Sequence, residues 1–287
     1  MATFESGGLT LAYDDIGGPG EGRPIVLVHG FTSNRKENWQ RLGWYGAFER
    51  RHVRMIAFDC RGHGESAKPH DPEFYGRENM AGDILTLMDH LAIERAHLLG
   101  FSMGSRLALA AALKAPQRFS TLTLGGVGEK LFEKREMVGN PMADAMAAAD
   151  VDSIKEPMLR SFRQFADDQG EDRLALAALT RAKDEPFTRE ELSSLDVPVL
   201  VVAGAATNLP AIPCHLRKSF ATAAPFRFPA AITSRPFRTR SSKRPCSTSW
   251  MERWPSHIAS LSASVTGVSR YIVGSTRFSA SIFGKSL

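Results

Sequence analysis

Residues 96–104 read Ala-His-Leu-Leu-Gly-Phe-Ser-Met-Gly, and they are followed by a stretch rich in alanine and leucine. The apolar run 96–99 indicates a buried strand, and residues 103–114 indicate a helix that ends before Pro116. Between them, Gly100-Phe101-Ser102-Met103-Gly104 has the pattern Gly-x-Ser-x-Gly. The flanking strand and helix predict a sharp turn that presents the Ser102 hydroxyl. The simpler alternative is a strand–glycine–helix turn in which Ser102 only caps the helix.

The two glycines have a physical reason to stand where they do. A sharp strand-to-helix turn strains the backbone of the central serine, and side chains two positions away on either side would collide. The helix that begins after Ser102 directs its free N–H groups and the positive end of its dipole to the same point. This arrangement favours a serine nucleophile beside a site for negative charge.

Further apolar runs predict the rest of a sheet. The predicted strands cover residues 24–28, 53–58, 122–124 and 198–203, and residues 3–15 predict an opening hairpin around Gly7-Gly8. Glu78 to Leu91 predict an amphipathic helix. Strands that alternate with helices indicate an α/β fold with a mostly parallel, doubly wound sheet. Residues 127–190 are polar, rich in Met and Ala and helical in pattern, which predicts a small helical cap insertion.

Two more motifs follow predicted strands: His29-Gly30-Phe31, and Asp59-Cys60-Arg61-Gly62-His63-Gly64-Glu65-Ser66. Together with residues 100–104 they resemble, over about residues 4–206, the α/β-hydrolase family in its branch with a short helical cap. The resemblance implies that Ser102 is the catalytic nucleophile and that the backbone N–H groups of Phe31 and Met103 form the oxyanion hole. A serine nucleophile implies a serine hydrolase acting on an ester, lactone or related carbonyl substrate, and argues against relatives that use aspartate.

Other residues of these motifs have structural interpretations. His29 is expected to brace its loop rather than to act as a base, and Asp59 and Arg61 are expected to fix their loop by hydrogen bonds. His63 is expected near the pocket without a catalytic role, and Cys60 is expected to be inert. Four side chains are equally compatible with the acyl pocket and with the core: Phe31, Trp39, Trp44 and Met103.

The acid and the base of a catalytic triad are not recognisable. The resemblance implies an acid after the strand that ends near Gly204 and a histidine after the last strand. The residues after Gly204 contain no carboxylate, and Glu252 is the only acid beyond Asp196. His215 and His257 remain as bases, but neither follows a predicted strand. The acid and the base therefore stay unassigned, and we expect weak or absent activity.

Composition changes at the same point. Residues 207–287 hold 12 Lys or Arg, 15 Ser and one acid, whereas residues 1–206 carry a net charge of −6. One interpretation is a disordered basic tail. The other is a shifted reading frame near residues 205–207, because the shifted frame of residues 227–252 can encode a strand end, Gly-Arg-Asp-His and an amphipathic helix. Both interpretations predict that the last strand and the closing helix are missing.

The expected organisation is a first core part at 1–126, a cap at 127–190, a core strand at 191–206 and an aberrant or disordered basic, Ser-rich tail at 207–287. The sequence shows no signal peptide or membrane span, and its three cysteines have no disulfide or metal spacing, which favours the cytoplasm. We expect a small-molecule ester-like substrate, no cofactor, no metal, and neither nucleic acid nor membrane as partner; the oligomeric state stays open. The alternative is a non-catalytic hydrolase-fold binding protein whose basic tail contacts nucleic acid or a membrane.

Overall fold

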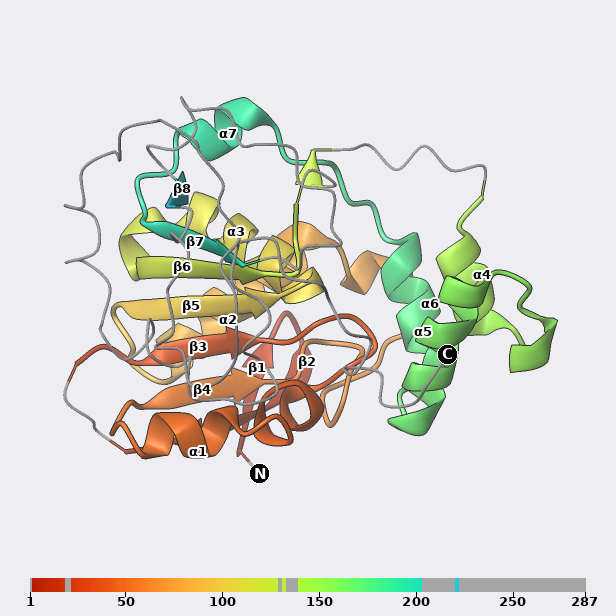
Figure 1. Ribbon diagram of the computed structural model, residues 1–287, viewed down its shortest axis with the longest axis horizontal. Helices are drawn as coiled ribbons and strands as arrows, with labels where there is room; N and C mark the ends of the chain where they lie inside the picture. The colour runs from red at the N-terminus through yellow and green to blue at the C-terminus, as the bar shows by residue number, and fades with distance from the viewer. Residues whose placement is uncertain (1, 19–21, 129–130, 133–138, 203–219, 222–287) are drawn as a thin grey trace, which may run out of the picture.

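The computed structural model describes residues 2–18, 22–128, 131–132, 139–202 and 220–221. One eight-stranded sheet runs through them in the order β1-β2-β4-β3-β5-β6-β7-β8 (Figure 1). Strand β2 pairs antiparallel with β1 and β4, and all other pairs are parallel, so the predicted mostly parallel sheet is confirmed. The strands are β1 Ala2–Ser6, β2 Leu9–Ile16, β3 Ile25–Val28, β4 Met55–Phe58, β5 Ala96–Phe101, β6 Phe119–Gly125, β7 Val199–Val202 and β8 Phe220–Ala221.

Helices connect and cover these strands. The α-helices of the described residues are α1 Trp44–Glu49, α2 Arg77–His90, α3 Met103–Lys114, α4 Pro141–Ala147, α5 Pro157–Asp168, α6 Arg173–Arg181 and α7 Arg189–Ser193. Shorter turns of helix are the π-helical η1 Lys36–Gln40 and the 3₁₀ turns η2 Pro72–Phe74, η3 Pro116–Arg118 and η5 Val151–Ser153. The helices predicted at 78–91 and 103–114 correspond to α2 and α3, whereas η1 and α1 were not anticipated.

The central strands are buried on both faces, as their uninterrupted apolar runs predict. In β3, Ile25 and Leu27 belong to a hydrophobic cluster that includes α1, while Val26 and Val28 belong to a larger cluster that includes α2 and α3. Because side chains of a strand alternate between the two faces, a strand that feeds two cores must be apolar at every position. The sheet thus separates two hydrophobic cores.

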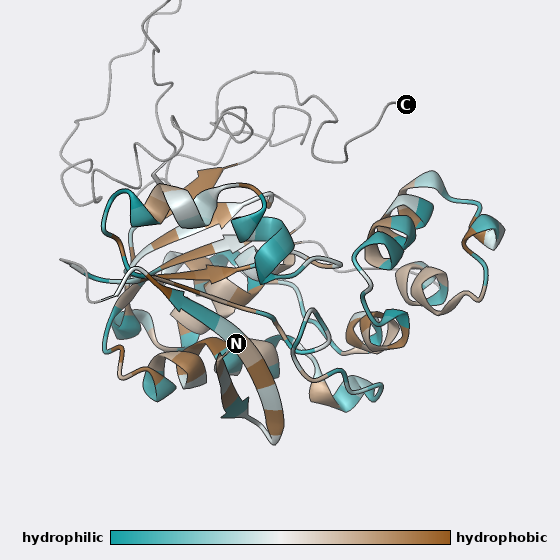
Figure 2. Ribbon diagram, turned by 90° about the horizontal axis from the view of Figure 1, so that it is seen from below, coloured by the Kyte–Doolittle hydropathy of each residue, from teal (hydrophilic) through white to brown (hydrophobic). Residues whose placement is uncertain are grey.

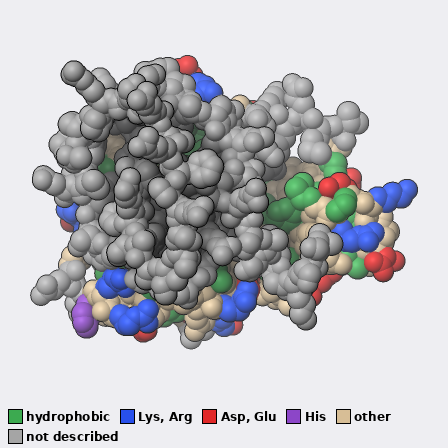
Figure 3. Space-filling view, viewed as in Figure 1, with side chains coloured by type: hydrophobic (Ala, Val, Ile, Leu, Met, Phe, Trp, Pro, Cys, Tyr) green, Lys and Arg blue, Asp and Glu red, His purple; other side chains and the backbone are tan. Residues whose placement is uncertain are grey.

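Helices α4, α5 and α6 form a group of their own beside the sheet (Figures 1 and 2). They enclose a small hydrophobic cluster of Ala143, Met146, Ala166, Leu176 and Ala177. The buried Arg163 of α5 donates to the carbonyls of Ala145, Met146 and Ala148 at the end of α4. On the outer surface of this group, charged side chains stand beside hydrophobic ones (Figure 3).

The segment that returns from these helices to the sheet is fixed to the core. Phe187 is 2% exposed, and the guanidinium carbons of Arg77 and Arg106 lie 4.4 and 5.5 Å from the centre of its ring. Arg106 also forms a salt bridge of 2.8 Å with Asp184. The return segment is therefore anchored on α2 and α3.

The prediction of a missing last strand and closing helix concerns residues 207–287. Of these the structure describes only Phe220 and Ala221, which form β8 on the outer side of β7. The predicted disordered tail and the shifted reading frame lie outside the described residues. Over the part of the chain that is described, no helix combines the length and the apolar character that a bilayer crossing requires.

Candidate active site

Ser102 occupies the turn between the last residue of β5 and the first residue of α3. Its backbone angles are φ 51° and ψ −109°, a conformation that non-glycine residues adopt only under strain. It is not part of a regular helix, and its side chain caps no N–H group of α3. The geometry matches the predicted strained turn and differs from an ordinary capping serine.

The glycines beside Ser102 are required by close backbone contacts. A Cβ atom on Gly100 would lie 2.2 Å from the carbonyl oxygen of Gly104. A Cβ atom on Gly104 would lie 2.1 Å from the carbonyl oxygen of Val28 in β3. No side chain fits at such distances, so the turn can pack against β3 only with glycine at both positions.

Backbone hydrogen bonds hold the turn at the end of β6. The Ser102 N–H donates to the carbonyl of Gly125 at 2.8 Å. The Ser105 hydroxyl lies 2.8 Å from the carbonyl oxygens of both Gly100 and Gly125. The Met103 N–H belongs to the first turn of α3, where N–H groups have no partner within the helix. Within the described part of the chain, it is therefore a donor next to Ser102 that has no partner in α3.

The loop that carries Phe31 lies beside this turn because β3 and β5 are neighbours. Val28 pairs with Gly100, so the residues that follow each strand run alongside one another. A Cβ atom on Gly30 would lie 3.2 Å from the ring of Phe101, which shows how closely the two segments approach. The structure thus brings the segments of Phe31, Ser102 and Met103 together at one edge of the sheet.

Phe31 also contacts the helical group α4–α6. Its ring centre lies 6.2 Å from that of Phe162 in α5 and 6.1 Å from that of His63. Met103 packs against the larger core cluster. Trp39, 2% exposed, and the half-buried Trp44 pack in the cluster on the α1 face, so the core interpretation is correct for both.

His29 braces its loop, as expected. Its Nε2 atom accepts a hydrogen bond of 2.9 Å from the Cys60 N–H, and its Nδ1 atom lies 2.8 Å from the carbonyl oxygen of Gly30. Both ring nitrogens are therefore engaged, with the proton on Nδ1. Burial lowers the pKa of His29, which keeps the ring neutral. The thiol of Cys60 is buried and burial raises its pKa, as expected for an inert cysteine.

His63 packs against His29, with ring centres 4.9 Å apart. Its Nδ1 atom lies 3.2 Å from the carbonyl oxygen of Arg61, and its Nε2 atom has no hydrogen-bond partner among the described residues. Burial, and then the neighbouring His29, lower the pKa of His63. His63 is therefore a neutral side chain under the loop of Phe31.

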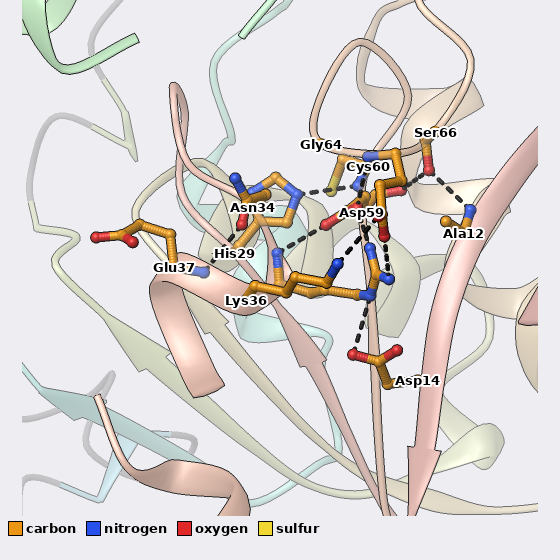
Figure 4. A network of polar contacts seen from close by, with 12 residues as sticks. Ala12, Asp14, His29, Asn34, Lys36, Glu37, Asp59, Cys60, Gly64 and Ser66 are labelled. Atoms are coloured by element: carbon orange, nitrogen blue, oxygen red, sulfur yellow. Dashed lines mark hydrogen bonds and ion pairs between the residues drawn. The ribbon is translucent and has the colours of Figure 1, made fainter. Parts of the chain in front are cut away.

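Asp59 and Arg61 fix their loop through ion pairs and hydrogen bonds. Asp59 accepts from the N–H groups of Arg35 at 2.7 Å and Glu65 at 2.8 Å (Figure 4). Arg61 forms two hydrogen bonds with Asp83, of 2.8 and 2.5 Å. Both expectations are confirmed.

Arg35 is the central residue of the same network, a role that no sequence pattern indicates. Its side chain is 1% exposed and forms ion pairs with Asp14, Asp59 and Glu65. An arginine in a polar loop is ordinarily solvent-exposed. Its three partners lie on β2 and on the loop that follows β4, so only the folded chain reveals the cluster.

The base and the acid stay unassigned. Among the described histidines, His97 contacts Thr121 inside the sheet, His90 contacts Tyr13, and His70 pairs with Asp172. His215 and His257 lie outside the described residues, as does the segment that follows β7. No group of three His, Cys, Asp or Glu side chains in the described part of the chain is arranged to hold a metal ion.

A family model described as alpha/beta hydrolase fold matches residues 23–192. Since this match covers more than half of the chain, the chain belongs to the α/β-hydrolase family. It is by family a hydrolase, with enol-lactonases among its relatives.

Individual similar proteins share 27–38% of their residues with this chain over the matched part. The chain is 38% identical, over 55% of its length, to the dihydrolipoyllysine-residue acetyltransferase component of the acetoin cleaving system of Pseudomonas putida, of which it spans only 40%. It is 27% identical to 3-oxoadipate enol-lactonase 1 of Acinetobacter baylyi, over 69% of this chain and 76% of that one. The crystal structure of the enol-lactonase from Burkholderia xenovorans has a TM-score of 0.61 and 27% identity, covering 77% of this chain and 88% of that chain.

Proposed function

We propose that this chain is a serine hydrolase in which Ser102 attacks the carbonyl carbon of an ester, a lactone or a related substrate. Attack forms a tetrahedral intermediate whose oxyanion accepts hydrogen bonds from the N–H groups of Phe31 and Met103. Collapse of the intermediate expels the alcohol and leaves an acyl group on Ser102, which water then releases as the acid. The strained backbone of Ser102 between Gly100 and Gly104 is the observation that carries this proposal.

The substrate class follows from the surroundings of Phe31 and from the relatives. Phe31, Met142 and Phe162 are partly buried apolar side chains against the cluster of the helical group. They favour a small to medium, partly apolar acyl or lactone group. Enol-lactonases among the similar proteins support a lactone or an ester as the substrate. We also propose that the chain acts in the cytoplasm.

The proposed organisation has a hydrolase core at 1–126 and 191–206, a cap at 127–190 and an aberrant tail at 207–287. We further propose that the tail results from a shifted reading frame. A chain with Ser102 and an oxyanion hole but without a base retains only the residual rate that oxyanion binding provides. Sequencing the gene across codons 203–210 tests the shift, and an intact frame there would refute it.

The experiment that tests the function combines labelling with turnover. The purified chain is incubated with an activated fluorophosphonate and digested, and the labelled peptide is identified by mass spectrometry. Label on Ser102, absent from Ser102→Ala, is the expected result. A panel of p-nitrophenyl esters and lactones is expected to give a low rate that Ser102→Ala reduces further. Label on another residue, or equal turnover of the chain and Ser102→Ala, would refute the assignment.

A further inference from the structure

Glu171 reaches from the helical group α4–α6 into the core. It lies in the turn between α5 and α6 and is 8% exposed. One carboxylate oxygen accepts a hydrogen bond of 2.9 Å from the side-chain amide of Asn34. The other accepts a hydrogen bond of 2.8 Å from the backbone N–H of Gly64. One carboxylate therefore connects three segments that are far apart in the sequence.

Both partners of Glu171 can only donate. The Asn34 side-chain oxygen accepts from the Glu37 N–H at 2.9 Å, which leaves its NH₂ group to face Glu171. Gly64 offers a backbone N–H. A carboxylate, which only accepts, satisfies both donors, whereas a glutamine would direct its own NH₂ group at one of them. The site is thus selective for an ionised glutamate.

The two bonds tie the loop of Phe31, which follows β3, to the neighbouring loop of Gly64, which follows β4. Asn34 follows Phe31 by three residues, and within that loop the Ser33 N–H donates to the Gly30 carbonyl. Gly64 belongs to the loop that Asp59 fixes. The position of the Phe31 N–H relative to Ser102 therefore depends on both loops keeping their places.

Simple stabilisation does not account for a buried carboxylate here. Among the described residues Glu171 forms no salt bridge within 4.0 Å, and its bonds go to neutral groups. Burial raises its pKa, the bonds from Asn34 and Gly64 lower it, Asp59 raises it and Lys68 lowers it. A buried charge without a cation at salt-bridge distance is costly, so an apolar contact would stabilise this junction better. Such departures from a stable arrangement are typical of functional positions.

We propose that Glu171 is a positioning residue: from the cap, it sets the loop that carries the Phe31 amide relative to Ser102. The effect of Glu171 on the reactivity of Ser102 rests on the proposed function. The claim that Glu171 holds the loop of Phe31 does not. The residual rate at Ser102 is expected to depend on the position of this loop, because a shift of about 1 Å in a reacting group can cost roughly 100-fold in rate.

Two isosteric variants test the contact, and one neighbouring variant serves as control. Glu171→Gln replaces an acceptor by a donor, and Asn34→Asp replaces the facing donor by a second acceptor while it keeps the bond to the Glu37 N–H. Asp172→Asn is the control, because Asp172 pairs with His70 on the exposed side of the same turn. Thermal unfolding is recorded to identify any variant that does not fold.

The first measurement is hydrogen–deuterium exchange on the full chain. Glu171→Gln and Asn34→Asp are expected to raise deuterium uptake at residues 30–34 and 62–65 several-fold, whereas Asp172→Asn leaves these peptides unchanged. The second is the rate of fluorophosphonate labelling of Ser102, which is expected to fall about 10- to 100-fold in the first two variants only. Lowering the pH through the titration of Glu171 is expected to slow labelling of the wild-type chain more than that of Glu171→Gln.

The outcomes separate this inference from the proposed function. Normal uptake at 30–34 in both variants overturns the positioning role, even when Ser102 is labelled as expected. Raised uptake with an unchanged labelling rate also overturns it, because the loop would then move without affecting Ser102. If Ser102 is not labelled at all, the proposed function fails, and the exchange experiment still decides whether Glu171 holds the loop.

Discussion

Ser102 keeps a left-handed backbone because its neighbours leave no alternative. Gly104 packs so closely on Val28 that the turn is pressed against β3, and the Ser102 N–H is tied to Gly125 on the other side. Strain of about 1–3 kcal/mol at one residue persists only where the surroundings over-determine it. The strained turn at Ser102 is therefore a property of three adjacent strands rather than of the five-residue pattern alone.

Gly104→Ala is expected to lower the free energy of unfolding by about 3 kcal/mol. The added methyl group would lie 2.1 Å from the Val28 carbonyl oxygen and 2.6 Å from that of His29, so backbone must move. Urea denaturation followed by circular dichroism measures the change. The control is Gly82→Ala in α2, where a Cβ atom meets nothing within 4 Å and helix propensity predicts a gain of about 0.5–1 kcal/mol. Equal effects of the two substitutions would contradict the packing argument.

At the scale of elements, the helical group α4–α6 depends on a buried arginine. Arg163 satisfies carbonyls at the end of α4 and pairs with Asp167 on its own helix at 2.9 Å. Helix ends leave carbonyl groups without partners, and a buried carbonyl that loses its donor costs about 1–3 kcal/mol. Arg163 thus supplies polar contacts between α4 and α5, beside the apolar contacts of the small cluster that the two helices share.

Arg163→Ala is expected to destabilise this group by about 3 kcal/mol and to raise deuterium uptake in peptides of α4 and α5 while those of β3 and β5 stay protected. Arg181→Ala, in the same group of helices, is the matched control. Arg181 is 45% exposed and lies 3.8 Å from Asp144, so its loss is expected to cost less than about 0.5 kcal/mol. Uptake confined to the mutated residue's own turn would show that Arg163 does not join the helices.

The elements that local sequence predicts are those whose pattern is self-contained. β3 and β4 are apolar at every position, and the glycines on both sides of Ser102 indicate the strained turn. Helix α1 could not be predicted because its six residues include Gly46 and are too few to show a helical pattern of apolar residues. Arg35 and Glu171 were missed for a different reason: their partners come from other segments, 137 residues away for Glu171 and Asn34. Only long-range packing reveals such contacts.

At the scale of the whole molecule, stability should depend on pH through two buried histidines. Burial lowers the pKa of both His29 and His63 below the ordinary value of 6.5. Below about pH 6.5 the unfolded chain therefore binds more protons than the folded chain. The free energy of unfolding is expected to fall with falling pH in that range, by at most about 1.4 kcal/mol per pH unit for each histidine.

His63→Leu is expected to remove one of these two contributions. The substitution removes the contact of 3.2 Å between Nδ1 and the Arg61 carbonyl oxygen but leaves no donor unsatisfied, because Nε2 of His63 has no partner among the described residues. Urea unfolding at fixed ionic strength between pH 5 and 7 measures the slope for both chains. Parallel slopes would show that His63 is protonated to the same extent in the folded and unfolded states.

The pairing of β3 with β5 has a consequence for how such a protein can change. The loop of Phe31 and the turn of Ser102 emerge from adjacent parallel strands, whose separation of about 4.8 Å is dictated by the main-chain ladder between them. Residues of α4, α5 and α6 do not enter that ladder. Substitutions there can change the apolar surroundings of Phe31 while the spacing of the two strands stays constant. The specificity of the proposed hydrolase can therefore diverge without any change in the sheet.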